Sequence, residues 1–265
     1  MLGKKQGLNK YAHIKLLMRI NSQAPDVLIF QPNGLHCAAF RPLELNMALP
    51  ECVEVTTGND PVGSVIWLHG LGADGHDFEP IVPELHLPDD MPLRFVFPHA
   101  PVRPVTINGG MAMRAWYDII SLDSEGRADA AGVHESTAIL EALIAREKER
   151  GIDAGKIVIA GFSMGGAVVI NTALHTSEKL AGMMALSAYL PLPGEVDASS
   201  SYRDLPVFMA HGSFDPMLPM QWGQLSAERL GEAGFTVEWH EYPMAHAVCP
   251  EEIRDIREWL LKVYA

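Results

Sequence analysis

Cysteine is scarce in this sequence, and its scarcity excludes a fold built on disulfides. The three cysteines, Cys37, Cys52 and Cys249, are odd in number, and no pair has the C-x-x-C spacing typical of zinc and redox sites. Long apolar runs are also missing, since none approaches the roughly 20 residues that span a bilayer. We therefore expect no stable membrane anchor and a reducing, cytoplasmic location.

Basic charge is the second scarcity. The 265 residues include 20 Lys and Arg against 33 Asp and Glu, which gives a net charge of −13 at pH 7. Nucleic acids and anionic membrane surfaces attract basic faces, so this balance argues against either as a general partner. The hydrophobic share of 48% instead predicts one large α/β domain with a sizeable core.

Residues 1–46 differ from the rest, because they hold six basic side chains against only two acidic ones. Lys15 and Arg19 interrupt their first apolar patch, which excludes a secretory signal sequence. The composition weakly resembles a transit peptide, and an appendage upstream of Met47 is the alternative that we favour. We expect residues 1–46 to be a poorly ordered N-terminal extension without a catalytic part, and residues 47–265 to form the functional domain.

Strand and helix patterns alternate through this domain. Apolar runs rich in β-branched and aromatic residues predict strands at 53–57, 64–68, 93–97, 156–160, 183–186, 206–210 and 235–239. Helical periodicity predicts helices at 77–85, 133–150, after 166, at 220–230 and from 251. This alternation predicts a mostly parallel sheet with helices on both faces. Functional sites in such sheets lie at the carboxyl ends of the strands.

A glycine-flanked serine lies between one predicted strand and helix. Gly161 and Gly165 flank Ser163 at the G-x-S-x-G spacing of a nucleophile elbow. The strand and helix of such an elbow pass close together, so the positions two residues either side of the serine must lack bulky side chains. We predict that Ser163 is a nucleophile, the alternative being a tight turn with an idle serine.

An aspartate and a histidine follow later strands. Asp215 comes after the predicted strand 206–210, and His246 lies in the last loop before the C-terminal helix. The chain order Ser, Asp, His is the α/β-hydrolase order. In this triad His246 would accept the proton of Ser163, and Asp215 would hold the imidazole in the required tautomer.

A glycine-rich loop follows the predicted strand 64–68, and its backbone amides are free to face a ligand. We predict that the amides of Leu71 and Met164 form the oxyanion hole. A metal site is the alternative, but no metallohydrolase spacing fits, and we expect neither a metal nor a cofactor. The candidate metal ligands in the loop are His69, Asp74, His76 and Asp77.

Five motifs occur in the order of a known family, at 69–75, 114–118, 161–167, 211–215 and 245–246. In these motifs the sequence resembles the carboxylesterase/acyl-protein thioesterase family, the phospholipase/carboxylesterase group of α/β-hydrolases, over residues 50 to 263. The resemblance implies an α/β-hydrolase fold without a large cap domain, and it allows a homodimer. Met164 stands where Gln is frequent in the family, but only its backbone amide enters the predicted oxyanion hole.

The segment 98–115 is long and rich in Pro and Gly. Its centre predicts a hairpin with an Asn108-Gly109 turn, which we interpret as a flap over the acyl site. We predict that Trp116, Met217 and Leu218 bind substrate, the alternative for Trp116 being a place in the core. Several methionines fall in or beside the predicted site loops and suit an adaptable apolar groove, namely Met111, Met113, Met164, Met217, Met220 and Met244.

The pattern therefore predicts a serine hydrolase that cleaves small carboxylic esters with short to medium acyl chains. The alternative is an acyl-protein thioesterase or lysophospholipase that removes long acyl chains. A non-catalytic binding protein of the same fold is disfavoured because all three triad residues are present. A peptidase is less expected, since the sequence shows no propeller or large cap domain.

Overall fold

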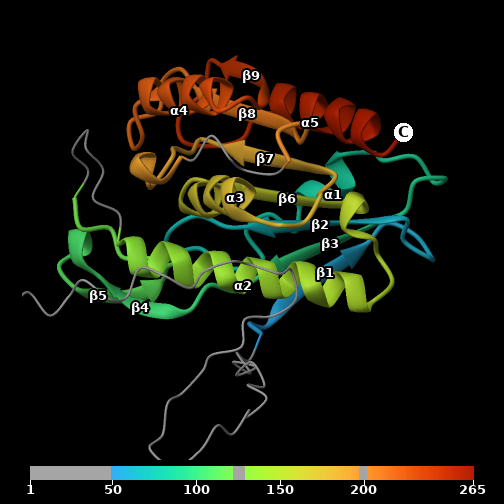
Figure 1. Cartoon of the computed structure of the whole chain (residues 1–265), viewed down its shortest axis with the longest axis horizontal. Coiled ribbons are helices and arrows are strands. Elements are labelled where there is room, and N and C mark those ends of the chain that lie inside the picture. Colours follow the sequence, from blue (N-terminus) through green and yellow to red (C-terminus); the bar gives the residue numbers. More distant parts are fainter. Residues whose placement is uncertain (1–48, 122–128, 197–201) are drawn as a thin grey trace, which may run out of the picture. The chain divides into compact units, whose positions relative to one another are not determined.

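The computed structural model describes residues 49–121, 129–196 and 202–265. The predicted extension at 1–46 lies outside the described residues. The described chain forms one central sheet with helices against it and a separate two-stranded hairpin (Figure 1). No inserted cap domain occurs within these ranges.

The central sheet has seven strands in the order β1-β3-β2-β6-β7-β8-β9. Among these described strands the edge pair β1 and β3 is antiparallel, and every other pair is parallel, as predicted. Alternate residues of the inner strands belong to two hydrophobic cores, one on each face of the sheet. Both faces of these strands are therefore apolar and buried. The strands are β1 (Cys52–Thr56), β2 (Gly63–Leu68), β3 (Leu93–Pro98), β6 (Ile157–Phe162), β7 (Gly182–Leu186), β8 (Pro206–Gly212) and β9 (Thr236–Tyr242).

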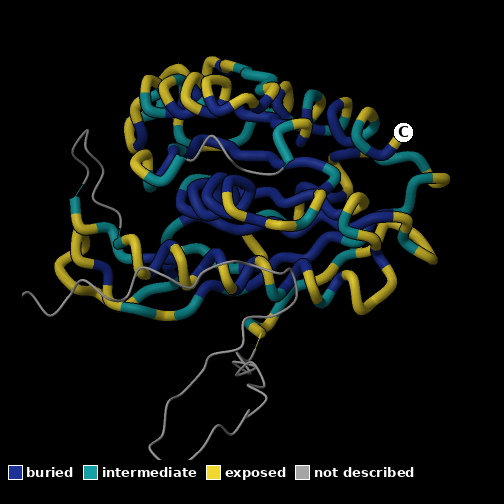
Figure 2. The backbone as a smooth tube through the Cα atoms, viewed as in Figure 1, coloured by how far each residue is buried: buried dark blue, intermediate teal, exposed yellow. Residues whose placement is uncertain are grey.

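Helices cover both faces of this sheet. One core joins α2 and α3 to one face, and a second core joins α1 and α5 to the other. Helix α3 is buried almost throughout, whereas the outer faces of α2, α4 and α5 are exposed (Figure 2). The helices are α1 (Ile81–Glu84), α2 (Ala130–Glu149), α3 (Met164–His175), α4 (Met220–Glu232) and α5 (Pro250–Val263), with short 3₁₀ turns at η2 (Ala154–Lys156) and η3 (Pro193–Glu195).

One local prediction was wrong in its bounds, and a second was correct for the hairpin but wrong for its turn. The helix expected at 77–85 is confined to α1, because Pro80 and Pro83 have no N–H for a longer helix and single turns precede it. The hairpin pairs β4 (Val102–Val105) with β5 (Met111–Arg114), so its loop is longer than the expected two-residue turn. The 3₁₀ turn η1 (Thr106–Asn108) fills this loop, and two glycines with positive φ complete it.

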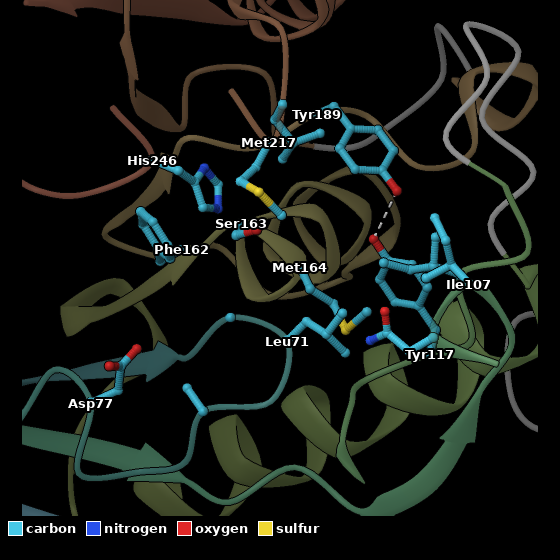
Figure 3. A pocket seen from close by; sticks show the side chains of 15 residues that line it. Leu71, Asp77, Ile107, Tyr117, Phe162, Ser163, Met164, Tyr189, Met217 and His246 are labelled. Atoms are coloured by element: carbon cyan, nitrogen blue, oxygen red, sulfur yellow. Dashed lines mark hydrogen bonds between the residues drawn. The ribbon is translucent and has the colours of Figure 1, made fainter. Parts of the chain in front are cut away.

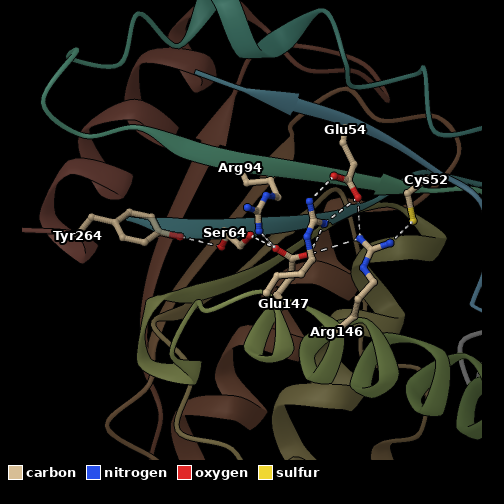
Figure 4. Close-up of polar contacts among 8 residues, drawn as sticks. Cys52, Glu54, Ser64, Arg94, Arg146, Glu147 and Tyr264 are labelled. Carbon is tan, nitrogen blue, oxygen red and sulfur yellow. Dashed lines mark hydrogen bonds and ion pairs between the residues drawn. The ribbon is translucent and has the colours of Figure 1, made fainter. Parts of the chain in front are cut away.

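The amino ends of β2 and β3 are tied to α2 through one buried carboxylate (Figure 4). Glu147 accepts hydrogen bonds from the Ser64 hydroxyl at 2.6 Å, from Arg94 at 2.8 Å and from Arg150 at 2.9 Å. Arg150 also pairs with Glu54 on β1 at 2.8 Å. Because these partners come from four elements, the network fixes α2 against the sheet edge at the end opposite the carboxyl ends of the strands.

Candidate active site

Ser163 lies at the junction of β6 and α3 with φ 54° and ψ −118°, a conformation that residues other than glycine rarely adopt. Two backbone hydrogen bonds hold it there. Its N–H donates to the Leu186 carbonyl at 2.8 Å, and its own carbonyl accepts from Ala167 at 3.1 Å. The strained turn raises the serine side chain above the carboxyl end of the sheet, as a nucleophile elbow requires.

The two flanking glycines explain the elbow's sequence pattern. A Cβ atom on Gly161 would lie 2.4 Å from the Gly165 carbonyl carbon. A Cβ atom on Gly165 would lie 2.4 Å from the Leu68 carbonyl oxygen. Any larger residue at either position would therefore push α3 away from β6 or β2.

His246 and Asp215 meet in the loops that follow β9 and β8. The His246 Nδ1 lies 2.6 Å from the Asp215 Oδ2, and the Asp215 side chain is fully buried. The other carboxylate oxygen accepts the amides of Met217 and Leu218, both at 2.8 Å. Since a carboxylate only accepts, Nδ1 carries the hydrogen and Nε2 is left free to accept a proton.

His246 lines the same cavity as Ser163, and Figure 3 shows its ring facing the serine. The Phe162 ring packs against the imidazole, with centroids 4.7 Å apart. The structure therefore brings together the three residues predicted as a triad, and both a carboxylate and an aromatic neighbour hold the His246 ring.

A second histidine supports the aspartate, and the sequence reasoning missed it. His211 lies near the end of β8, fully buried, and its Nε2 lies 2.9 Å from the Leu218 carbonyl and 3.4 Å from Asp215. Burial lowers the pKa of His211, so the ring stays neutral and donates from Nε2. It thereby fixes the loop whose amides hold Asp215. Its position inside the motif 211–215 was the available signal.

The predicted oxyanion hole has two free amides at the expected place. Gly72 donates to the Arg114 carbonyl at 2.8 Å, while the Leu71 amide has no backbone acceptor among the described residues. Met164 is the first residue of α3, so its amide has no acceptor inside the helix. The assignment of Leu71 and Met164 as oxyanion donors stays a prediction, and this geometry is consistent with it.

Trp116 lies beneath this loop and not on the cavity wall. Its side chain is fully buried, and its indole N–H donates to the His69 carbonyl at 2.9 Å. The Trp116 amide lies 3.2 Å from the Met164 sulfur, and its carbonyl accepts from the Ser136 hydroxyl. Trp116 therefore supports the glycine-rich loop from below, which agrees with the core alternative and not with substrate contact.

Ser163 and His246 line an apolar cavity of about 400 Å³ (Figure 3). Of the predicted substrate residues, Met217 and Leu218 line it. Of the predicted methionine groove, Met164 and Met217 line it, whereas Met111 is exposed on the hairpin. The hairpin turn contributes Ile107 and Asn108, so part of the predicted flap borders the cavity. Sequence reasoning missed Asp77, Tyr117, Ile119, Phe162 and Tyr189 as lining residues.

Polar groups around the cavity carry shifted pKa values. Burial raises the pKa of Asp77 at the rim, and the nearby Asp74 raises it further. Burial also raises the pKa of Tyr117 well above its ordinary value. Burial lowers the pKa of His69, whose Nε2 accepts the Ala100 amide at 3.1 Å. The histidine beneath the glycine-rich loop is therefore neutral and structural.

No group of three or more His, Cys, Asp or Glu in the described ranges is arranged to hold a metal ion. No helix in these ranges combines the length and the apolar character that crossing a membrane requires.

Comparisons with known proteins agree with this geometry. The family model described as Phospholipase/Carboxylesterase matches residues 50–264. Acyl-protein thioesterase 1 of Cryptococcus neoformans is 37% identical over 220 residues, which cover 75% of this chain and 91% of that protein. Its namesake in Neurospora crassa is 38% identical over 208 residues, covering 74% and 85%.

Solved structures give the same result. The crystal structure of Zea mays acyl-protein thioesterase 2 is 26% identical with a TM-score of 0.71, covering 82% of this chain and 100% of that one. Arabidopsis thaliana SOBER1 is 28% identical with a TM-score of 0.71, covering 77% and 99%. The chain therefore belongs to the phospholipase/carboxylesterase family of α/β-hydrolases, and it is an enzyme of this ester-hydrolase family.

Proposed function

We propose that this chain removes medium to long acyl groups from thioesters and esters, as an acyl-protein thioesterase does, through an acyl-enzyme on Ser163. The observation that carries the proposal is the fixed Asp215–His246 pair beside a strained serine, at the mouth of an apolar cavity. The curated relatives at 37–38% identity are named acyl-protein thioesterases. Both facts favour long acyl groups over the small esters that the sequence pattern first suggested.

The geometry supports the following first half of the proposed reaction. The Ser163 hydroxyl attacks the acyl carbonyl carbon while His246 Nε2 takes its proton. The carbonyl oxygen becomes an oxyanion, and the amides of Leu71 and Met164 donate to it. Collapse of this intermediate breaks the bond to the thiolate or alkoxide. His246 returns its proton to that leaving group, and the acyl group stays on the serine.

The second half repeats the steps with water. His246 takes a proton from water as the hydroxide attacks the acyl-enzyme carbonyl, and the same amides stabilise the new oxyanion. Collapse then releases the carboxylic acid, and the proton returns to Ser163. Asp215 keeps its hydrogen bond to the His246 Nδ1 and stabilises the imidazolium in each half.

The lining of the cavity supports the proposed preference for longer acyl chains. Much of its wall is aliphatic or thioether, and such side chains gain free energy by covering methylene groups. Each buried CH₂ contributes about 0.8 kcal/mol, so kcat/KM rises with chain length until the cavity is filled. Unbranched methionines on the wall adapt to chains of different length.

The test is hydrolysis of p-nitrophenyl esters from acetate to palmitate, beside an S-acyl cysteine peptide and its O-acyl serine analogue. We expect activity to rise with chain length, to favour the thioester and to vanish in Ser163→Ala. A maximum at acetate or butyrate would return the assignment to small esters. Activity that persists in Ser163→Ala would overturn the triad.

We also propose that residues 47–265 hold the whole catalytic function. The family match begins at residue 50, which supports this boundary. Deleting residues 1–46 should leave kcat and KM for p-nitrophenyl octanoate unchanged within about twofold. A large loss of kcat would show that the extension contributes to the site. A homodimer stays a prediction from the sequence resemblance.

A further inference from the structure

Two phenol groups interrupt the apolar cavity. Tyr117 follows β5 and Tyr189 follows β7, and their hydroxyl oxygens lie 3.1 Å apart (Figure 3). Both side chains line the cavity that contains Ser163. Figure 3 places this pair on the side of the cavity away from His246. An acyl group attached to Ser163 and directed away from the base would therefore approach the two hydroxyls.

The hydrogen bonds of this pair are incomplete. Each phenol has one donor and accepts as well, but their shared bond uses only one of the two hydrogens. Neither hydroxyl has another hydrogen-bond partner in the described part of the chain. Tyr117 is fully buried, and burial raises the pKa of both tyrosines. Both groups therefore stay protonated, and one O–H remains available to a ligand.

We propose that Tyr117 and Tyr189 select acyl groups that carry a hydroxyl or carbonyl oxygen along the chain. The inference rests on the proposed function, because it assigns the cavity to the acyl group. Such an oxygen accepts the spare phenol hydrogen, and an acyl hydroxyl also donates to a phenol lone pair. A plain methylene chain covers the same two groups without giving them a partner, which is unfavourable.

A purely structural role for the pair predicts a different result. In that case the bond would only tie the loop after β5 to the loop after β7. Its loss would then slow every substrate by a similar factor or lower the melting temperature. A role in recognition instead changes the ratio between oxygenated and plain substrates, because sites that bind a hydroxyl discriminate against analogues without it.

The experiment compares p-nitrophenyl octanoate with three derivatives, each bearing a single hydroxyl on a different one of the last three carbons; these are the hydroxylated isomers. Three derivatives bearing a methyl group at the same carbons control for volume. We expect at least one hydroxylated isomer to exceed its methyl control about 10-fold in kcat/KM, the effect of one good hydrogen bond. Tyr117→Phe and Tyr189→Phe should each reduce this ratio, and the double variant should bring it to about 1.

Tyr242→Phe is the matched control. Its hydroxyl also makes one hydrogen bond, to Asp255 at 2.6 Å, but Tyr242 does not line the cavity. This variant should keep the wild-type ratio. If Tyr117→Phe fails to fold, the less buried Tyr189→Phe alone tests the same ratio.

The proposal is overturned if no hydroxylated isomer exceeds its methyl control, or if the double variant keeps the wild-type preference. Failure of the proposed function has a different signature. In that case the wild type hydrolyses none of the esters, or Ser163→Ala hydrolyses them equally well.

Discussion

The two ends of the central sheet differ in whether their polar groups have hydrogen-bond partners within the protein. At the amino ends of β2 and β3, the buried carboxylate of Glu147 is bound by a hydroxyl and three guanidinium groups. At the carboxyl ends, the Leu71 amide lacks a backbone acceptor among the described residues, and Ser163 is held at a positive φ. One end therefore pairs its buried carboxylate within the fold, and the other keeps a backbone amide free for a ligand.

This difference suggests that the amino ends of the strands contribute to stability and the carboxyl ends to the chemistry. A buried carboxylate with complete hydrogen bonds fixes helices against strands, and removing it exposes its unpaired partners. Backbone strain and unpaired amides are unfavourable in the folded state. The amides stabilise a transition state because its oxyanion supplies the acceptor that they lack. Substitutions at the amino ends should change unfolding, and substitutions at the carboxyl ends should change turnover.

The largest expected effect is that of Ser163→Ala. Loss of the nucleophile should lower kcat by about 10⁵-fold or more, while the free energy of unfolding changes by less than about 1 kcal/mol. Steady-state hydrolysis of p-nitrophenyl octanoate and urea unfolding measure the two quantities. A variant that keeps its kcat would contradict the division between the two ends.

Asp215→Asn should come next, with kcat lower by about 10³- to 10⁴-fold. The amide side chain can donate to Nδ1, which favours the tautomer in which Nε2 carries the hydrogen and cannot act as a base. His211→Asn is the comparison, because His211 touches the aspartate loop and not the cavity. We expect it to lower kcat much less, through displacement of Asp215. Equal losses in the two variants would place His211 in the chemistry itself.

Glu147→Ala tests the opposite end. Removing this carboxylate leaves Arg94 and Ser64 without their partner, so the free energy of unfolding should fall by about 3–5 kcal/mol. Turnover of the variant well below its melting temperature should match that of the wild type. A fall in kcat with unchanged stability would show that the two ends are coupled.

The same carboxylate predicts acid sensitivity. Burial by itself would raise the pKa of Glu147, but the hydrogen bonds from Ser64 and Arg94 outweigh it and hold this pKa below its ordinary value. Its stabilising contribution is therefore complete above the ordinary carboxyl pKa and is lost as the pH falls through the lowered one. Urea unfolding of wild type and Glu147→Ala between pH 3 and 6 should show the two curves converging toward acid.

Glu252→Gln should have the smallest effect and the opposite pH dependence. Glu252 is fully buried on α5 with no cation paired to it in the described residues, and burial raises its pKa to about 8. Because the folded state binds this proton more tightly, the stability of the wild type falls as the pH rises from about 4.5 to about 8 and levels off above that pH. The glutamine variant should lack that fall and be more stable by about 2 kcal/mol at a pH of about 8.5. Parallel curves for the two proteins would refute the assignment.

The meeting of the three residues predicted as a triad could be foreseen because parallel strands bring them to one edge of the sheet. Ser163, Asp215 and His246 each follow a predicted strand, and parallel strands bring their carboxyl ends to one edge. The Leu71 loop follows β2 for the same reason. The strand order did not need to be known for these residues to converge.

Features set by packing could not be predicted in this way. Trp116 directly precedes Tyr117, which lines the cavity, yet contacts with His69 and Ser136 bury Trp116 beneath the glycine-rich loop. The pair Tyr117 and Tyr189 is 72 residues apart and depends on how two loops meet. Sequence periodicity carries no information on either arrangement.

The most direct test of the account is covalent labelling with a fluorophosphonate, mapped by peptide mass spectrometry. This reagent phosphonylates a serine whose hydroxyl is activated by a base and whose oxyanion is stabilised. We predict a single adduct, on Ser163, which forms much more slowly in Asp215→Asn and at the wild-type rate in Glu147→Ala. An adduct on another residue, or a folded chain that stays unlabelled, would contradict the assignment of the chemistry to this end of the sheet.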